Sequence, residues 1–301
     1  MNAKPARLEN IVTDKGKVPV YATGIIEQPW DDYSAGDHDV WRQLYERQRE
    51  ILVGRACDEF LAAQDAMGMT PDRIPKFADI NAVLEAATGW TLIGVEGLLP
   101  ELDFFDHLAN RRFPVTWWIR RPDQVDYIEE PDLFHDLFGH VPLLMNPLFA
   151  NYMQAYGKGG VKAHGIGADA LQNLTRLYWY TVEFGLINQK KDGQPDGLRI
   201  YGSGIVSSKG ESIHCLESDA PNRIGFDLER IMRTRYRIDS YQKTYFVIDS
   251  FEQLMDATRP DFTPIYARLA PQDSIPAGNV LDSDAVFHRG SGEGWATDGD
   301  V

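Results

Sequence analysis

The segment from Ala168 to Asn188 constrains the fold most, because its apolar residues recur with the period of an α-helix over about five turns. These apolar positions are Ala170, Leu171, Leu174, Leu177, Tyr178, Val182 and Leu186. The chain also contains 7 Trp, 13 Tyr and 14 Phe, which can supply a core for such a helix to pack against. A globular domain built around a buried helix is therefore expected.

Weaker patterns along the rest of the chain predict a mainly α fold with a minor β component. Asp37 is expected to cap a stretch of one or two helices that ends near Met69. Further helices are expected at about 78–87, 102–110 and 251–258, and short strands at 90–95, 113–120, 198–201, 213–216 and 245–248. Pro114 limits the strand at 113–120 to a sheet edge or a strand start.

The 301 residues are expected to form one domain with less regular ends. Residues 1–36 contain three Pro and three Gly without clear periodicity, which indicates an irregular N-terminal arm. Residues 37–270 carry the patterned elements of the folded domain. Residues 271–301 are acidic and rich in Gly, Ser and Ala, so we expect a flexible tail that forms no core.

Charge and composition exclude several classes of partner. The formal charge of −15 would repel nucleic acid and anionic membranes, which leaves small molecules as the expected ligands. No apolar run approaches the roughly 20 residues of a membrane span, and the first residues lack the apolar core of a signal peptide, so a cytoplasmic protein is expected. The two cysteines, Cys57 and Cys215, lie far apart in the sequence and suggest neither a disulfide nor a thiolate metal site.

Two histidines five residues apart are the first sign of chemistry. Pro131 is typical of a helix start, and Gly139 and Pro142 of a helix end, so His135 is expected inside a short helix. In an ideal helix, His140 would lie about 140° around the axis from His135. We expect Gly139 to adopt a left-handed conformation that swings the second imidazole back towards the first.

A pair of neutral imidazoles needs a further ligand to bind a divalent metal, and a carboxylate is the usual third one. Glu183 is the candidate, because it lies in an aromatic segment where a buried carboxylate needs a cation or hydrogen bonds. Trp179 precedes it by one helical turn. The pair is not the H-E-x-x-H of zinc proteases, since the spacing is five and Asp136 occupies the second position. Structural histidines and an outward-facing Glu183 remain alternatives at this point.

Three ordered blocks of sequence together carry a specific resemblance. They are Pro131-Asp132-x-x-His135-Asp136-x-x-Gly139-His140-Val141-Pro142, Tyr178-Trp179-x-Thr181-Val182-Glu183-Phe184-Gly185, and Tyr201-Gly202-x-Gly204-x-x-Ser207-Ser208-x-Gly210-Glu211. Over roughly residues 15–265 the chain resembles the pterin-dependent aromatic amino acid hydroxylases. The resemblance implies a single-domain helical basket around a mononuclear iron site.

The same resemblance implies the cofactors and the metal ligands. His135, His140 and Glu183 would form a 2-His-1-carboxylate triad on Fe(II), with Glu183 and Tyr178 counted as catalytic. A tetrahydropterin, either tetrahydrobiopterin or a related pterin, would supply electrons, and O2 would be the cosubstrate. The implied pterin-binding residues are Leu99, Phe104, Asp136 and Tyr178. The implied substrate-binding residues are Arg120 for the carboxylate, Trp179 and Phe184 for the aromatic ring, and Ser207.

For the reaction itself, the resemblance favours hydroxylation of L-phenylalanine to L-tyrosine. Hydroxylation of tryptophan by the same machinery is an alternative, because the pocket walls of such enzymes differ by few side chains. A zinc-dependent hydrolase that uses the same three ligands is the alternative from another class, and an inactive binding module is a third. The animal members' regulatory domain and tetramerising coiled coil are not recognised, so a monomer is expected.

Overall fold

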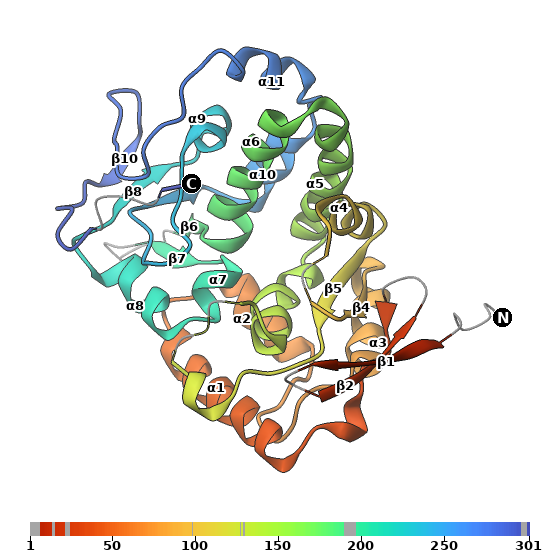
Figure 1. Cartoon of the computed structure of the whole chain (residues 1–301). Helices are drawn as coiled ribbons and strands as arrows, with labels where there is room; N and C mark the ends of the chain where they lie inside the picture. The colour runs from red at the N-terminus through yellow and green to blue at the C-terminus, as the bar shows by residue number, and fades with distance from the viewer. Residues whose placement is uncertain are drawn as a thin grey trace.

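The computed structural model describes residues 7–13, 16–21, 25–97, 99–126, 128, 130–189, 197–295 and 300–301, with side chains from residue 25 onward. Helices dominate it and three small sheets lie among them (Figure 1), which confirms the mainly α fold with a minor β component. The α-helices are α1 Ala35–Leu52, α2 Asp58–Ala66, α3 Phe77–Thr88, α4 Glu101–Ala109, α5 Pro147–Ile166, α6 Ala168–Tyr178, α7 Ser203–Val206, α8 Lys209–Glu217, α9 Leu228–Arg233, α10 Phe251–Thr258 and α11 Thr263–Leu269. The helices expected at 78–87, 102–110 and 251–258 are confirmed as α3, α4 and α10.

Other short helical turns join these elements. Turns of 3-10 type occur at Trp30–Asp32, Pro122–Gln124 and Pro142–Met145, and turns of π type occur at His135–His140 and Trp179–Glu183.

The N-cap of the first long helix lies three residues earlier than expected. Ser34 is the N-cap, and its hydroxyl accepts a hydrogen bond from the backbone N–H of Asp37 (3.2 Å). The carboxylate of Asp37 accepts from the N–H of Ser34 in return (2.8 Å). Asp37 is therefore the third residue of a capping box and not the cap itself. The stretch to Met69 divides into α1 and α2.

Two of the sheets flank the helices. One has the order β3-β4-β5, built from Ile25–Ile26, Thr91–Val95 and Arg112–Thr116, with β4 and β5 parallel. The other has the order β10-β8-β9-β6-β7, built from Val286–His288, Asn222–Gly225, Thr244–Ile248, Leu186–Asn188 and Leu198–Ile200. Pro114 lies in β5 at the edge of the first sheet, as expected, because an edge strand needs no donor on its free side.

The strand expected at 213–216 is wrong, because these residues belong to α8. The hydroxyl of Ser208 accepts from the N–H of Glu211 and caps the helix (3.4 Å). Glu211, Ser212 and Cys215 are buried while Ile213 is exposed, which is a helical burial pattern and not the alternation of a strand. A segment of four residues was too short to distinguish the two periods.

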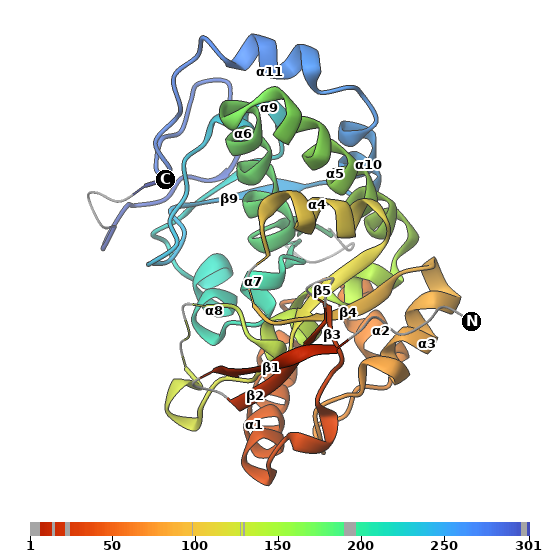
Figure 2. The same cartoon turned by 45° about the vertical axis from the view of Figure 1, so that its right-hand side comes forward.

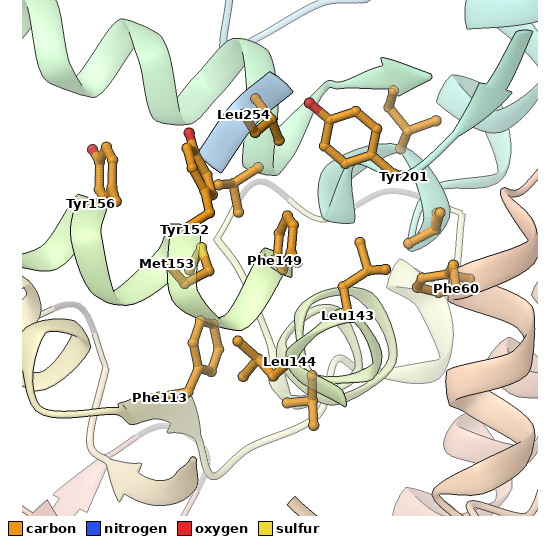
Figure 3. Packing of buried hydrophobic residues seen from close by; sticks show 14 of the residues in the cluster. Phe60, Phe113, Leu143, Leu144, Phe149, Tyr152, Met153, Tyr156, Tyr201 and Leu254 are labelled. Atoms are coloured by element: carbon orange, nitrogen blue, oxygen red, sulfur yellow. The ribbon is translucent and has the colours of Figure 1, made fainter. Parts of the chain in front are cut away.

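One continuous core joins the helices. Phe149, Tyr152 and Tyr156 line the inner face of α5 and pack with residues from β5, α10 and the Pro142–Met145 turn (Figure 3). Both overall views place α4 and α6 beside α5 (Figures 1 and 2). Leu137 and Phe138 of one π turn and Tyr180 and Val182 of the other belong to this core, so both turns are packed into it.

The described residues near both ends of the chain contain more regular structure than expected. The described part of residues 1–36 contains an antiparallel hairpin of β1 Arg7–Thr13 and β2 Gly16–Tyr21, where irregular backbone was expected. In the acidic tail, Ala277 is buried and β10 pairs with β8. Asp284 also forms an ion pair with Arg230 (3.0 Å), and both side chains are 5% exposed. The expectation of a tail without core contacts is wrong, because cations distant in the sequence neutralise its carboxylates.

Candidate active site

A π turn explains the five-residue spacing of the two histidines. The N–H of Val141 donates to the carbonyl of Asp136 (3.3 Å), which is the i to i+5 bond of a π-helix. One π turn therefore separates His135 from His140, and their Nε2 atoms lie 3.0 Å apart. The left-handed Gly139 that we expected is wrong, since Gly139 is not among the positive-φ residues of the described chain.

Gly139 serves the site by its small size. A Cβ atom at this position would lie 2.8 Å from the carbonyl oxygen of Ser203, which is too close for a carbon atom. The missing side chain lets α7 approach the π turn, and α7 and the residue after it supply Ser203 and Ser207. The glycine thus sets a distance between two elements and not the direction of the chain.

The second π turn carries Glu183. The N–H of Phe184 donates to the carbonyl of Trp179 (2.8 Å), so α6 ends at Tyr178 and the helix predicted through Asn188 is too long. The hydroxyl of Thr181 donates to the carbonyl of Leu177 (2.5 Å), and such side-chain bonds compete with the regular helical ladder. The π turn directs the carboxylate of Glu183 towards the histidines.

The three predicted ligands converge on one point. The Nε2 of His140 lies 3.1 Å from one carboxylate oxygen of Glu183, and the Nε2 of His135 lies 3.7 Å from the other. The hydroxyl of Ser203 donates to the carboxylate of Glu183 (2.9 Å). Burial alone would raise the pKa of Glu183, but the facing His140 and His135 and the hydrogen bonds from His140 and Ser203 lower it below its usual value. Glu183 is therefore ionised at neutral pH.

A chain of hydrogen bonds fixes the tautomer of His135. The hydroxyl of Ser207 donates to the carbonyl of Ser203 (2.7 Å), so it accepts from the Nδ1–H of His135 (2.9 Å). Burial lowers the pKa of His135 to about 4, so the ring is neutral and its one proton is on Nδ1. Its Nε2 is a bare lone pair that faces the ionised Glu183. Nε2 of His135 and the carboxylate of Glu183 have no hydrogen between them, so both can donate electron pairs to a metal cation. A mixture of nitrogen and oxygen ligands suits iron or zinc.

Asp136 is a second carboxylate near the histidines. Its ligand atom and those of His135 and His140 lie within 4.8 Å of one another. However, its carboxylate accepts from the N–H of Thr116 (2.7 Å), and burial raises its pKa to about 7. Glu183 is closer to both imidazoles and is the stronger anion. Glu183 is therefore the better candidate for the third ligand position.

The residues expected to bind substrate line one cavity of about 550 Å³. Arg120, Trp179, Phe184 and Ser207 all contribute to its wall, together with the predicted ligands His135 and Glu183. The rings of Trp179 and Phe184 lie 4.7 Å apart and form an aromatic side of the cavity.

The residues expected to bind the pterin lie outside this cavity lining. The ring of Tyr178 stacks 6.2 Å from that of His140, and Phe104 contacts Tyr178 edge to face at 5.9 Å. Asp136 is buried beside Thr116, and Leu99 is partly buried just before α4. Tyr178 and Phe104 thus lie on the His140 side, and the expected substrate residues line the cavity beside His135 and Glu183.

Asp132 is a site residue that the motif contained but to which sequence reasoning gave no role. Its carboxylate accepts from Nε and Nη2 of Arg120 (2.9 and 2.8 Å) and from the N–H of His135 (3.0 Å). Burial alone would raise the pKa of Asp132, but its bonds to Arg120 and the charge of Arg120 lower it. Its position three residues before His135, where a carboxylate can cap a helix start, was the available signal.

Sequence reasoning also missed a wall of the cavity formed by residues 238–242. Gln242 accepts a hydrogen bond from the indole N–H of Trp179 (3.0 Å). Tyr236, just before this wall, stacks on Trp179 at 4.3 Å. These residues lie in an irregular segment without periodicity, so no sequence pattern marked them.

A helical fold that places two imidazoles and a carboxylate beside an aromatic cavity defines a mononuclear metal-dependent enzyme. Comparison with known families refines this class. The family described as biopterin-dependent aromatic amino acid hydroxylase matches residues 21–267. The chain belongs to this family, which confirms the family predicted from the three sequence blocks.

Relatives of known identity support the assignment. The chain is 61% identical over 276 residues to a phenylalanine-4-hydroxylase of Ralstonia nicotianae, which covers 92% of this chain and 86% of that protein. It is 60% identical, with a TM-score of 0.85, to cobalt-bound phenylalanine hydroxylase from Chromobacterium violaceum, and 89% of this chain and 95% of that chain are covered. It is 59% identical, with a TM-score of 0.83, to the same enzyme with iron(III) and 7,8-dihydrobiopterin. That match covers 88% of this chain and 93% of that chain. No helix among the described residues is long and apolar enough to cross a membrane.

We predict that Gly139→Ala destabilises the protein by about 1–3 kcal/mol, because the added methyl group would push α7 from the π turn. Urea unfolding measures the change. Gly159→Ala is the matched control, since Gly159 lies within α5 with open space around it and the change should be neutral or stabilise by up to about 1 kcal/mol. Equal stability of Gly139→Ala and wild type would contradict the close approach of α7.

Glu211 gives a prediction about pH. Burial raises its pKa from an ordinary value of 4.5 to about 7, although Tyr245 and the N–H of Gln242 donate to it. Between these two values the unfolded chain releases the proton while the folded chain keeps it, so stability falls as pH rises. The total loss is on the order of 3 kcal/mol at 1.36 kcal/mol per pKa unit.

Glu211→Gln should remove this fall, because an amide mimics the protonated acid and keeps an oxygen for the N–H of Gln242. Urea unfolding of both proteins between pH 4.5 and 7 measures it. Parallel stability curves for the variant and wild type would contradict a proton on Glu211.

Proposed function

We propose that this chain is an iron(II)- and tetrahydropterin-dependent monooxygenase that converts L-phenylalanine to L-tyrosine with O2. The observation that carries the proposal is the convergence of the bare Nε2 of His135, the Nε2 of His140 and the ionised Glu183 at the wall of an aromatic cavity. Membership of the biopterin-dependent family supports the cofactors, and relatives named phenylalanine-4-hydroxylase at 56–61% identity support the substrate.

His135, His140 and Glu183 would hold the iron, and the carboxylate would offset part of its charge. Iron(II) and a reduced pterin bound here would supply the electrons and the oxygen activation that ring hydroxylation requires. The protein's own part is to keep the ligands in the right state. Ser207 holds the proton of His135 on Nδ1, and Ser203 orients the carboxylate of Glu183.

Arg120 would bind the carboxylate of the amino acid substrate. Asp132 occupies Nε and Nη2 of its guanidinium, which fixes the side chain in the cavity wall and leaves Nη1 for the substrate. The same Asp132 accepts from the backbone of His135, so the substrate anchor and a metal ligand share one buried support. Trp179 and Phe184 would hold the aromatic ring and exclude water.

The pterin would lie on the His140 side of the centre, against Phe104 and Tyr178, with Asp136 and Leu99 completing its site. The stacking of Tyr178 beside His140 supports this placement, because it puts an aromatic platform next to a predicted ligand. Tyr178 would thereby act at the boundary between pterin and metal.

We further propose that the protein is a cytoplasmic monomer whose catalytic domain spans residues 37–270. The family match covers residues 21–267, so it ends close to the end of this domain and begins 16 residues before its start. Cys57 and Cys215 are both buried and free, which suits a reducing compartment.

We predict that the purified protein with iron(II), tetrahydropterin and O2 forms tyrosine from L-phenylalanine. Its kcat/KM should be at least about tenfold higher than for hydroxylation of L-tryptophan, a difference of about 1.4 kcal/mol. The cavity of about 550 Å³ also admits an indole, so both substrates are assayed side by side. A preference for tryptophan would reassign the substrate, and product formation without pterin or O2 would reject the oxygenase.

The two nearby carboxylates should differ sharply in metal binding. We predict that Glu183→Ala lowers the affinity for iron(II), measured anaerobically, by more than about 100-fold, because it removes a ligand. Asp136→Asn should lower it less than about tenfold, since Asp136 faces Thr116 and an amide mimics its protonated form. The opposite order would make Asp136 the third ligand.

A further inference from the structure

One side of the substrate cavity is an irregular loop, residues 236–243, which we call the wall loop. Its members Ile238 to Gln242 line the cavity, and it contains no helix or regular strand before β9 begins at Thr244. Ile238 is 58% exposed and Tyr241 is 53% exposed, so burial of the tip does not hold the loop in place. Its position depends on contacts at its two ends.

The first end pairs with the last residue of the sequence. The N–H of Tyr236 donates to the carbonyl of Val301 and the N–H of Val301 donates to the carbonyl of Tyr236, both at 2.9 Å. The ring of Tyr236 stacks on Trp179 at 4.3 Å and 21°. Val301 therefore fixes the backbone directly behind the aromatic wall of the cavity.

The second end pairs with the neighbouring residue. The Nζ of Lys243 lies 2.9 Å from a carboxylate oxygen of Asp300, and their side chains are 9% and 11% exposed. The other oxygen of Asp300 accepts from the N–H of Ala277 (3.1 Å), and Nη1 of Arg237 lies 3.9 Å from Asp300. Asp300 thus pairs with the buried Lys243, where an unpaired charge would be costly, and it also lies near Arg237, whose closer partner is Asp239 at 2.7 Å.

Gln242 transmits the position of the loop to the cavity. Its side-chain amide donates to the carbonyl of Arg237 (2.7 Å) and accepts from the indole N–H of Trp179 (3.0 Å). Its backbone N–H donates to Glu211 (3.3 Å). A shift of either end of the loop would therefore move a group that holds Trp179.

We propose that Asp300 and Val301 are positioning residues for substrate binding, because they clamp both ends of the wall loop and so fix Gln242 and Trp179 against the substrate ring. The proposal rests on the proposed function in that it takes the cavity to hold an aromatic substrate. Asp284 supplies the contrast, since it belongs to the same acidic segment but pairs with Arg230, away from the wall loop.

The test compares Asp300→Asn with Asp284→Asn in the full-length, iron-loaded protein. Asp300→Asn should raise KM for L-phenylalanine about 5–20-fold with kcat changed less than about threefold, and should lower the tyrosine formed per pterin oxidised at least about twofold, because a loose wall admits water. Asp284→Asn removes a buried ion pair, so it should lower Tm but leave KM and coupling within about twofold. Asp300→Glu keeps the charge and should restore most of the wild-type KM.

Hydrogen exchange of the peptide that covers the wall loop gives a second readout, which needs no turnover. Asp300→Asn should raise its exchange rate at least about tenfold, and Asp284→Asn should not. If Asp300→Asn does not fold, Asp300→Asn/Lys243→Met replaces the ion pair without leaving a buried charge and should show the same loss of protection and rise in KM.

The proposal is overturned if Asp300→Asn behaves like Asp284→Asn in all three readouts, or if the loop loosens while KM and coupling stay within twofold of wild type. A wild type that hydroxylates no aromatic amino acid would instead reject the proposed function. Exchange would then still show whether Asp300 holds the loop in place.

Discussion

The site depends on two π turns that face each other beside α7. In each turn one additional residue per hydrogen-bonded ring changes the direction of the side chains, which brings two imidazoles and a carboxylate to one point. Gly139 allows α7 to approach closely, and Ser203 and Ser207 then set the orientation of Glu183 and the proton of His135. The arrangement separates two surfaces. An aromatic cavity lies on the side of Glu183, and an aromatic platform adjoins His140.

The sequence predicted three residues that the structure brings together, but it did not predict how they come together. The order of the three blocks identified His135, His140 and Glu183, and the structure places all three together. The spacing of five between the histidines was correctly treated as a problem for an α-helix. The remedy we expected was a left-handed Gly139, whereas the actual one is a π turn. Gly139 instead permits close packing against Ser203, 64 residues away. Contacts of this range leave no periodic signal.

Contacts between residues far apart in the sequence also explain where the predicted fold was wrong. Regular helices such as α3 and α10 were predicted closely, because periodicity and caps are local properties. The acidic tail was predicted to be free because its own composition lacks a core, yet Asp284 and Asp300 are paired with cations that precede them by more than 50 residues. The composition shows that the tail has carboxylates that would be costly to bury alone. It does not show which distant cations pair with them.

The π turn at His135–His140 also fixes the number of residues in this part of the chain. A π turn is an α-helical turn with one residue inserted, so a chain with one residue fewer between the histidines would still place both imidazoles on one face of an ordinary α-helix. Everything after His140 would, however, be rotated by about 100° relative to the preceding helix. The Pro142–Met145 turn and α5 follow at once, and α5 carries Phe149 and Tyr152 into the core. The metal site and the hydrophobic core therefore require the same residue count, and a deletion that spares the histidine pair would turn the aromatic face of α5 away from its partners.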